Sequence, residues 1–332
     1  MEGISFCTPA GRTLLFNAGL GVQTGQLKNL GRYPLIVAAG LTGNVFVPIA
    51  FIGVVSQTLR LWHNPDEVQN TLVGLALVAS MPIAGSSTAW SQNANGNLAL
   101  SLGLVVLSTL LSPLTTPVLL HAAGFLTTGD YSEDLHALAS SGTGGFLAIG
   151  VILPALLGMA GHVAVGEARI ASSKPVLKLF NSINLLLLNY SNASLSLPET
   201  IADPDWDFLA VVLATVICLC VLAFASGWLI ARLVGADGNV RISLMFGLGM
   251  NNNGTGLVLA SMALADHPRV LLPILFYNLV QHVVAGGLDF ALARFSGRLG
   301  HSGARGSATA GPASQSVPAK DSALLPSEKT AP

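Results

Sequence analysis

Apolar stretches of about 20 residues alternate with short polar segments along nearly the whole chain. A helix of that length is long enough to cross the ~30 Å hydrocarbon core of a bilayer. The pattern predicts seven such helices, at Pro34–Leu61, Thr71–Asn93, Asn97–His121, Thr143–Val165, Phe208–Val234, Arg241–Ala265 and Val270–Arg294. Thr8–Gln23 and Pro175–Tyr190 are shorter and weaker candidates. The prediction is an all-α polytopic membrane protein with about nine crossings.

The amino-acid composition is also typical of a membrane protein. Of 332 residues, 52% are hydrophobic and only 9% are charged, whereas a soluble globular domain has roughly 25% charged residues. The formal net charge of -1 provides no basic surface for a phosphate backbone. These values exclude an ordinary soluble enzyme and a nucleic-acid-binding protein. They leave open the number of chains in the assembly.

The charged residues between the spans predict an orientation. Two loops carry acidic residues without Lys or Arg, and they contain Asp130, Glu133, Asp134, Glu199, Asp203, Asp205 and Asp207. The remaining loops carry most of the basic residues. By the positive-inside rule, the acidic loops and the N-terminus are predicted to lie outside a plasma (inner) membrane, and the C-terminus in the cytoplasm. Three basic residues fall on the predicted outer side and are exceptions: Arg12, Arg60 and Arg269.

Composition also predicts the domain organisation. Residues 1–298 form the transmembrane domain, while residues 299–332 are rich in Ser, Ala, Gly, Pro and Gln. A segment of that kind buries too little apolar surface to order itself. We therefore expect residues 299–332 to be a disordered cytoplasmic tail.

Two of the predicted spans contain polar and helix-breaking residues where uninterrupted hydrocarbon would be expected. The first contains Pro82, Gly85 and the run Ser86–Thr88, and the second contains Asn251–Asn253 between glycines. Pro and clustered Gly interrupt a helix, and the exposed backbone is tolerated in a bilayer only against protein or a wet cavity. Each interrupted span is flanked by two long spans, and loop charges give these two units opposite orientations. This arrangement is typical of inverted repeats that form the midplane site of a secondary transporter.

Ionisable residues are scarce inside the spans. His282 lies near the middle of the last span, where an ionisable side chain is a candidate for function. No Asp or Glu lies in the central part of any predicted span. The span interiors therefore contain no set of nucleophile, acid and base, and we expect a protein that is not an enzyme.

Several blocks of the chain resemble the bile acid:sodium symporter family, over about Leu14 to Phe295. The matching blocks are Gly96–Ser101, Ser108–Leu114, Gly249–Gly254 and Gln281-His282. The resemblance implies a core domain with two crossed, discontinuous helices, here about residues 34–121 and 208–294. It implies a panel domain at about 8–23 and 143–190. It also implies nine helices, or ten with the first one truncated.

The resemblance implies site residues as well. One sodium ion would be held by Ser87, Thr88 and Ser101, and a second by Asn251 with the carbonyls of Leu248 and Met250. The residues facing the substrate would be Gly85, Ser86, Asn252, Asn253, Gln281 and His282. Four positions depart from the family pattern. Gly247 replaces a glutamate that touches both sodium ions, and Val105 replaces a threonine. The family's Ser-Asn pair is Ser87-Thr88 here, and Asn251 replaces a glutamine. Sodium is thus a possible coupling ion whose binding is weakened, and no other cofactor is expected.

The expected function is secondary active transport of a small organic anion by alternating access. The resemblance implies a bile-acid-like compound, a steroid sulfate or a small carboxylate. Coupling of this transport to sodium is doubtful. Coupling to protons through His282 and uncoupled transport both remain open. Two alternatives remain as well: a membrane sensor or receptor that keeps the ligand cleft without transporting, and a degenerate, truncated paralogue.

Overall fold

The computed structural model describes residues 28–140, 143–166, 204–264 and 266–306, with isolated residues between 13 and 20 and between 169 and 202. Within these residues every regular element is a helix. Five stretches are long and apolar enough to cross a membrane: Pro34–Leu61, Leu98–Gly124, Ala148–Val165, Trp206–Leu233 and Pro268–Arg294. They confirm an all-helical, multi-pass chain. The total of nine crossings stays a prediction, because the spans expected at Thr8–Gln23 and Pro175–Tyr190 lie largely outside the described residues.

The four longest helices begin close to the predicted bounds, and three of them also end close to those bounds, whereas the last one extends beyond Arg294. They are α3 (Pro34–Thr58, continued by η2, Leu59–Leu61), α6 (Leu98–Gly124), α11 (Trp206–Leu233) and α14 (Leu271–Gly306). Asn97 caps α6 by accepting from the amide of Leu100 at 3.0 Å. Asp205 caps α11 by accepting from the amide of Phe208 at 3.3 Å. These side chains satisfy amides that the first turn of a helix leaves free.

The two spans that were predicted to be interrupted are each divided into two helices. The first forms α4 (Pro65–Ser80) and α5 (Ser86–Asn93), and the second forms α12 (Gly238–Gly249) and α13 (Asn253–Ala263). Extended backbone connects each pair, and Pro82 lies in the first connection. Pro has no amide hydrogen to continue a helix. The predicted discontinuities are therefore present.

Residues after α6 form helices in place of a loop. The acidic segment that was read as a loop is α7 (Asp130–Ser140), which buries Leu135 and Leu138. It is followed by α8 (Thr143–Leu147), the π-helical turn η3 (Ala148–Ile152) and α9 (Leu153–Val165). On α9, Nδ1 of His162 lies 2.7 Å from the carbonyl oxygen of Leu20. This contact joins the two regions that the sequence assigned to one panel domain.

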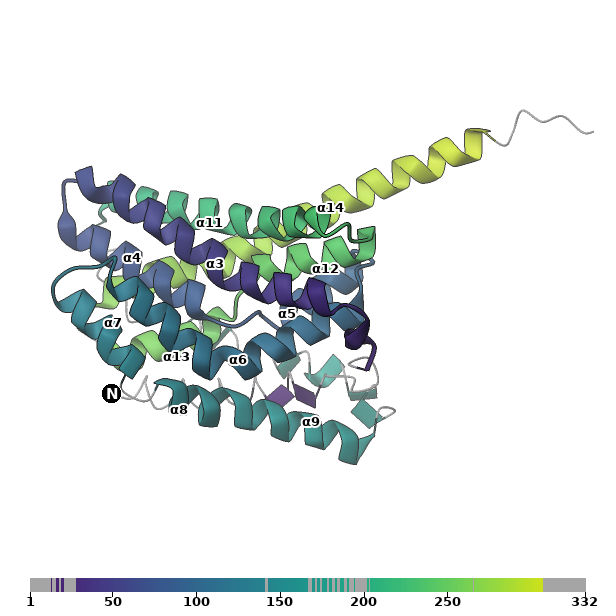
Figure 1. Cartoon of the computed structure of the whole chain (residues 1–332), viewed down its shortest axis with the longest axis horizontal. Helices are drawn as coiled ribbons and strands as arrows, with labels where there is room; N and C mark the ends of the chain where they lie inside the picture. Colours follow the sequence, from purple (N-terminus) through teal and green to yellow (C-terminus); the bar gives the residue numbers. More distant parts are fainter. Residues whose placement is uncertain are drawn as a thin grey trace, which may run out of the picture. The chain divides into compact units, whose positions relative to one another are not determined.

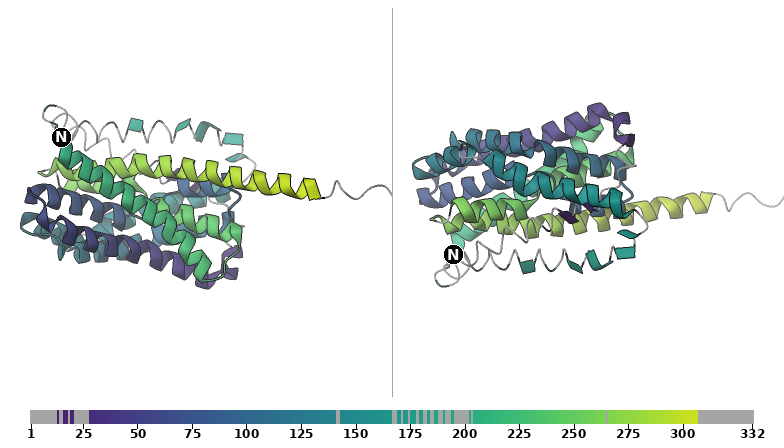
Figure 2. Two further views of the ribbon diagram at one scale, coloured as in Figure 1. Left: turned by 90° about the horizontal axis from the view of Figure 1, so that it is seen from above. Right: turned by 90° about the horizontal axis from the view of Figure 1, so that it is seen from below.

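The chain consists of two compact units, Met1–Phe290 and Ala291–Pro332. In the first unit, α3, α4, α6, α11 and α12 lie alongside one another (Figures 1 and 2). Their shared core is aliphatic and includes Val37, Leu100, Leu104, Val240, Leu244 and Leu248. In the second unit α14 continues to Gly306, past residue 299 where a tail was expected, and residues 307–332 lie outside the described part of the chain.

Opposite charges gather at opposite ends of the first unit. At one end His63 pairs with Asp207 at 3.4 Å and His267 pairs with Asp134 at 3.6 Å. At the other end the amide of Asn97 donates to the carbonyl of Asn239 at 3.0 Å, close to Arg232 and Arg241 in the sequence. We call these the acidic end, defined by Asp66, Asp130, Glu133, Asp134, Asp205 and Asp207, and the basic end, defined by Arg32, Arg232 and Arg241.

A glycine sets the distance between α11 and α12. A Cβ atom at Gly227 would overlap the carbonyl of Leu244, which is backbone and cannot move aside as a side chain can. We expect Gly227→Ala to lower the midpoint of thermal unfolding in detergent by several degrees. Gly53→Ala is the control, because a Cβ there meets nothing within 4 Å. Equal midpoints for the two variants would contradict this view of the packing.

Candidate functional site

The two interrupted helices cross at their extended connections. Ile83 and Asn251 face each other in an antiparallel bridge. The amide of Ala84 donates to the carbonyl of Met250 at 2.9 Å, and the amide of Asn252 donates to the carbonyl of Pro82 at 2.8 Å. Each connection thus satisfies backbone groups of the other, which is the condition for non-helical backbone inside a membrane. We call this region the crossing.

The long helix α6 secures the first connection. Ser108 Oγ accepts from the amide of Ile83 at 3.1 Å and donates to the carbonyl of Val105 at 3.1 Å. Thr116 Oγ1 donates to the carbonyl of Ser80, the last residue of α4, at 2.6 Å. One amide and one carbonyl of the interrupted helix are therefore satisfied by side chains of the helix that follows it.

The long helix α14 secures the second connection in a similar way. Gln281 Oε1 accepts from the amide of Asn251 at 3.0 Å, and Gln281 Nε2 donates to Asn278 at 3.2 Å. Tyr277 donates its hydroxyl to the carbonyl of Gly249, the last residue of α12, at 3.3 Å. Asn251 Nδ2 also donates across the crossing to the carbonyl of Val78 at 3.0 Å. The crossing is thus fixed to both long helices.

Two helix N-termini begin at the crossing. α5 starts at Ser86 and α13 starts at Asn253, and neither first turn is capped by a side chain. A helix N-terminus carries a partial positive charge of about half a unit and has free amides. Gly85 and Ser86 are exposed, and Asn252 is half-buried. Several amides of these first turns already donate to nearby carbonyls: Ser87 to Ala84, Thr88 to Gly85, Asn253 to Asn251 and Thr255 to Asn252. The two helix ends therefore contribute mainly partial positive charge without a formal charge, which suits an anion.

Several polar atoms buried at the crossing have no protein partner. Among the described residues these are Ser87 Oγ, Asn251 Oδ1, and both Oδ1 and Nδ2 of Asn253. Ser87 is 0% exposed and Asn253 is 1% exposed. A buried polar atom without a partner is destabilising by about 1–3 kcal/mol, so a group of them at one place indicates a site that is completed by water or a ligand.

The residues assigned to sodium by resemblance contribute neutral oxygens. Ser101 donates to Thr88 Oγ1 at 3.5 Å, which is a weak contact. The Met250 carbonyl already accepts from Ala84, and Leu248 is buried. A Cβ at Gly247 would lie 3.3 Å from Leu104 Cδ1, so this position faces an aliphatic side chain. Within the described residues no three His, Cys, Asp or Glu side chains form a cluster that could hold a metal ion.

The predicted residues on α5 and around Asn251–Asn253 therefore lie together. Gln281, which was expected to face the substrate, is 2% exposed, and its amide is bonded to Asn251 and Asn278. His282 follows it on α14 and is half-buried. Neighbours on a helix point about 100° apart, so the two side chains do not share a direction.

Sequence reasoning missed the residues that secure the crossing, namely Ser108, Thr116 and Tyr277. A signal for the first two was present. The apolar helix α6 carries four buried hydroxyl residues at spacings of seven, four and four, which is one face of a helix: Ser101, Ser108, Ser112 and Thr116. Tyr277 had no comparable signal, because a single aromatic residue in an apolar helix is ordinary packing.

Comparison with known proteins places the chain among membrane transporters. Residues 12–294 match the model of the SBF-like CPA transporter family. The "Uncharacterized protein YbaS" of Bacillus subtilis (strain 168) is 27% identical over 283 residues, which cover 85% of this chain and 87% of that protein. The "Uncharacterized sodium-dependent transporter YocS" of the same organism is 26% identical over 251 residues, covering 75% of this chain and 71% of that protein.

The role of Ser108 can be tested against a neighbour on the same helix. Ser108→Ala leaves the buried amide of Ile83 without its acceptor, and we expect a loss of about 1–3 kcal/mol. Ser112 is also buried but donates only to Thr109 of its own helix, at 2.8 Å, so Ser112→Ala is expected to be much milder. Thermal unfolding in detergent measures both. A Ser112→Ala variant less stable than Ser108→Ala would refute the assignment.

Proposed function

Because the chain belongs to the SBF-like CPA transporter family, we propose that it is a secondary transporter that carries a small organic anion by alternating access. The proposal depends on one observation: at the crossing, two uncapped helix N-termini begin beside buried polar atoms that have no protein partner. One of the blocks that resemble bile acid:sodium symporters, Gly249–Gly254, contains Asn251 and Asn253. The proposed substrate classes are bile-acid-like compounds, steroid sulfates and small carboxylates.

The charge of the proposed substrate follows from the local electrostatics. No Asp or Glu belongs to the described residues of the two connections, 81–85 and 250–252. The amides at the starts of α5 and α13 favour negative charge by typically 0.3–1 kcal/mol each, and by more where water is excluded. An anion at this place is attracted by both helix ends, whereas a cationic substrate would meet the same ends with repulsion.

Among the residues proposed to contact the substrate, Gly85, Ser86 and Asn252 are the accessible ones. Asn253 is buried, and its unpartnered amide group is available to a ligand that enters the crossing. His282 is proposed to line the same region from α14. For Gln281 we propose a positioning role, because it holds the amide of Asn251.

The residues at the crossing fit a sodium ion in part. Ser87 Oγ and Asn251 Oδ1 are buried oxygens without partners, and a hard cation takes oxygen ligands. When bound, sodium would neutralise the charge of the anion beside it. The carboxylate that would strengthen this site is missing, since Gly247 faces Leu104. We therefore propose that sodium binds weakly at this site.

The motion that alternating access requires is proposed to take place between two groups of helices. Hydrogen bonds from α6 and α14 fix the crossing to those helices, so the site is expected to move with them as one body. The other group comprises α8, α9 and the regions near residues 8–23 and 166–190. A substrate held at the crossing would then be exposed to each side in turn.

Transport is tested by counterflow in liposomes that hold the purified full-length chain and an unlabelled carboxylate or sulfate. We expect uptake of the labelled compound by the wild type and at least tenfold less by Ser87→Ala and Asn252→Ala. Removing the unpartnered hydroxyl of Ser87 breaks no hydrogen bond within the protein. The thermal midpoint of Ser87→Ala is therefore expected to equal that of the wild type. Binding without counterflow in the wild type would refute transport and indicate a sensor.

Ser91→Ala is the matched control. Ser91 lies one turn further along α5, is also 0% exposed, and bonds to Ser243 of α12 at 2.9 Å. Its replacement is expected to lower the thermal midpoint while counterflow continues, the reverse of Ser87→Ala. Loss of counterflow in Ser91→Ala but not in Ser87→Ala would place the site elsewhere.

The weak sodium site can be strengthened by a carboxylate. Gly247→Glu buries a charge beside Leu104, and in choline buffer we expect a lower thermal midpoint than that of the wild type. Sodium should raise the midpoint of this variant by mass action and should raise that of the wild type much less. Gly247→Gln has the same size without the charge and is expected to show no sodium response. Equal sodium responses in all three proteins would contradict the proposal.

A further inference from the structure

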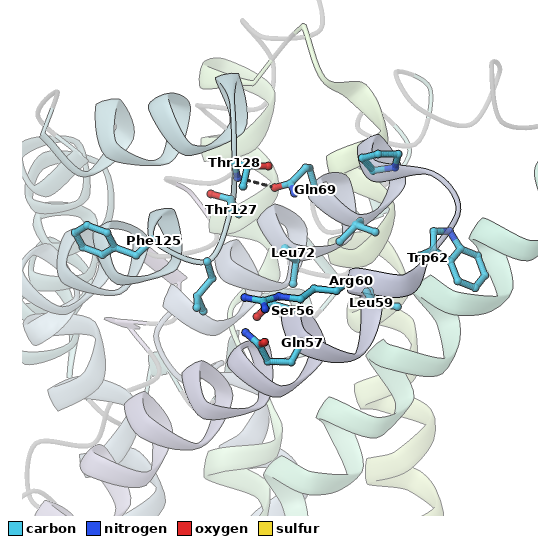
Figure 3. Close-up of a pocket in the computed structure, with 13 residues that line it drawn as sticks. Ser56, Gln57, Leu59, Arg60, Trp62, Gln69, Leu72, Phe125, Thr127 and Thr128 are labelled. Atoms are coloured by element: carbon cyan, nitrogen blue, oxygen red, sulfur yellow. Dashed lines mark hydrogen bonds between the residues drawn. The ribbon is translucent and has the colours of Figure 1, made fainter.

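A cavity of about 280 Å³ lies at the acidic end, away from the crossing. It is open to the surface and is lined by the end of α3 with η2, the first turns of α4, and residues 125–128 after α6 (Figure 3). None of its lining residues belongs to the two connections that form the crossing. The volume is close to the lower bound of about 300 Å³ for small-molecule pockets, so a small ligand fits and a large one does not.

The cavity carries a single kind of charge. Arg60 is the charged residue among the described residues that line it. Figure 3 shows the Arg60 side chain lying across the cavity, with its guanidinium close to Ser56 and Gln57. Among the described residues, no carboxylate forms an ion pair with Arg60 within 4 Å. A guanidinium presents several hydrogen-bond donors in one plane.

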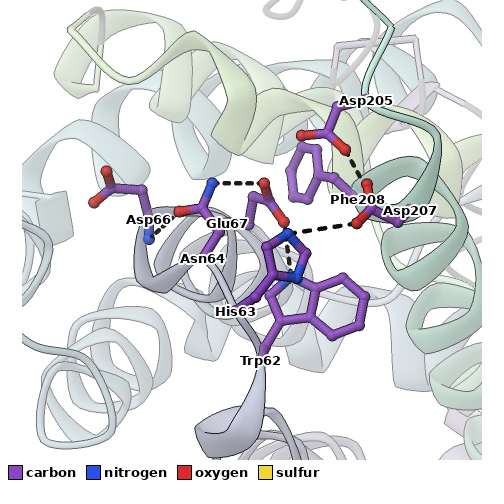
Figure 4. Close-up of polar contacts among 8 residues, drawn as sticks. All are labelled: Trp62, His63, Asn64, Asp66, Glu67, Asp205, Asp207 and Phe208. Atoms are coloured by element: carbon purple, nitrogen blue, oxygen red, sulfur yellow. Dashed lines mark hydrogen bonds and ion pairs between the residues drawn. The ribbon is translucent and has the colours of Figure 1, made fainter.

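Two acidic residues at this end of the unit, Glu67 of α4 and Asp207 of α11, are engaged with other partners (Figure 4). Glu67 is 2% exposed, and its two oxygens accept from Trp62 Nε1 at 2.7 Å and from Asn64 Nδ2 at 2.6 Å. Asp207 pairs with His63 at 3.4 Å. The carboxylates of Glu67 and Asp207 thus have other partners, and neither forms an ion pair with Arg60.

The other lining residues suit an organic acid. Gln69 Oε1 accepts from the amide of Thr128 at 3.0 Å, which orients the Gln69 side chain and leaves its NH₂ group as a donor. Leu72 and Phe125 provide apolar walls (Figure 3). A cation, an amide donor and an apolar wall match a carboxylate attached to a small hydrocarbon group.

Arg60 is also one of the three exceptions to the predicted distribution of basic residues. The acidic end carries many carboxylates, and their field repels anions. The positive charge of Arg60 offsets this field locally, so an anion can bind in the cavity next to it.

We infer that this cavity binds the carboxylate of a small organic acid, as a second site separate from the crossing. The inference depends on the proposed function only for the class of ligand. A phospholipid headgroup presents a similar anionic group, so the experiment has to distinguish the two sources.

The test measures binding of 4-fluorobenzoate to the purified full-length chain by ¹⁹F relaxation, in nanodiscs of phosphatidylcholine. We expect Arg60→Ala to weaken the binding of 4-fluorobenzoate in this cavity about tenfold or more, which is the range for a charge-assisted hydrogen bond. Arg269→Ala is the matched control, because it removes the same charge from the same end without lining the cavity, and it should bind as the wild type does. The neutral analogue 4-fluorobenzyl alcohol should show no dependence on Arg60.

Three results would overturn the inference: unchanged binding in Arg60→Ala, an equal loss in Arg269→Ala, or abolition of binding when phosphatidylglycerol is added to the nanodiscs. The last result would assign the cavity to a lipid headgroup. Asn252→Ala separates this site from the crossing, since it should leave the Arg60-dependent binding intact. A protein that binds at Arg60 but shows no counterflow would refute the proposed function and leave this inference standing.

Discussion

The structure depends on the satisfaction of backbone groups where two membrane helices are interrupted. In hydrocarbon, each free amide or carbonyl is destabilising by several kcal/mol. The extended connections meet this requirement by bonding to each other, through Ala84 to Met250 and Asn252 to Pro82. Side chains from α6 and α14 satisfy four more backbone groups, those of Ile83, Ser80, Asn251 and Gly249. The crossing is consequently a rigid part of the fold, although it lies where regular helix is absent.

That rigidity explains why buried polar atoms can remain unpaired beside it. Ser87 and Asn253 are buried without partners for the atoms named above, while the hydroxyls of Ser91 and Ser108 have hydrogen-bond partners on other elements. The unpartnered polar atoms of Ser87 and Asn253 add nothing to the stability of the folded chain. Their presence is better explained by a ligand than by packing, because packing would be served equally well by Ala.

The two anion sites that we propose use different sources of positive charge. At the crossing the source is the partial charge of helix ends, which needs no ionised side chain in a low-dielectric region. At the acidic end the source is the formal charge of Arg60, which water screens and which can remain exposed. This difference matches the location of each site, since a buried guanidinium without a partner would be strongly destabilising.

The sequence alone determined the class of protein, the long helices and the two interruptions. Those features follow from local properties: the length of apolar runs, the missing amide of Pro82, and polar residues such as Asn251–Asn253 that cannot face lipid. It did not reveal α7, because charged residues at Asp130 and Asp134 resemble a loop until Leu135 and Leu138 find a surface to pack against. Only the tertiary structure decided that Ile83 meets Asn251, that Gln281 is occupied by backbone, and that Arg60 faces a cavity. These are contacts between residues far apart in the chain, and their geometry depends on how the helices pack, which no local pattern of residues encodes.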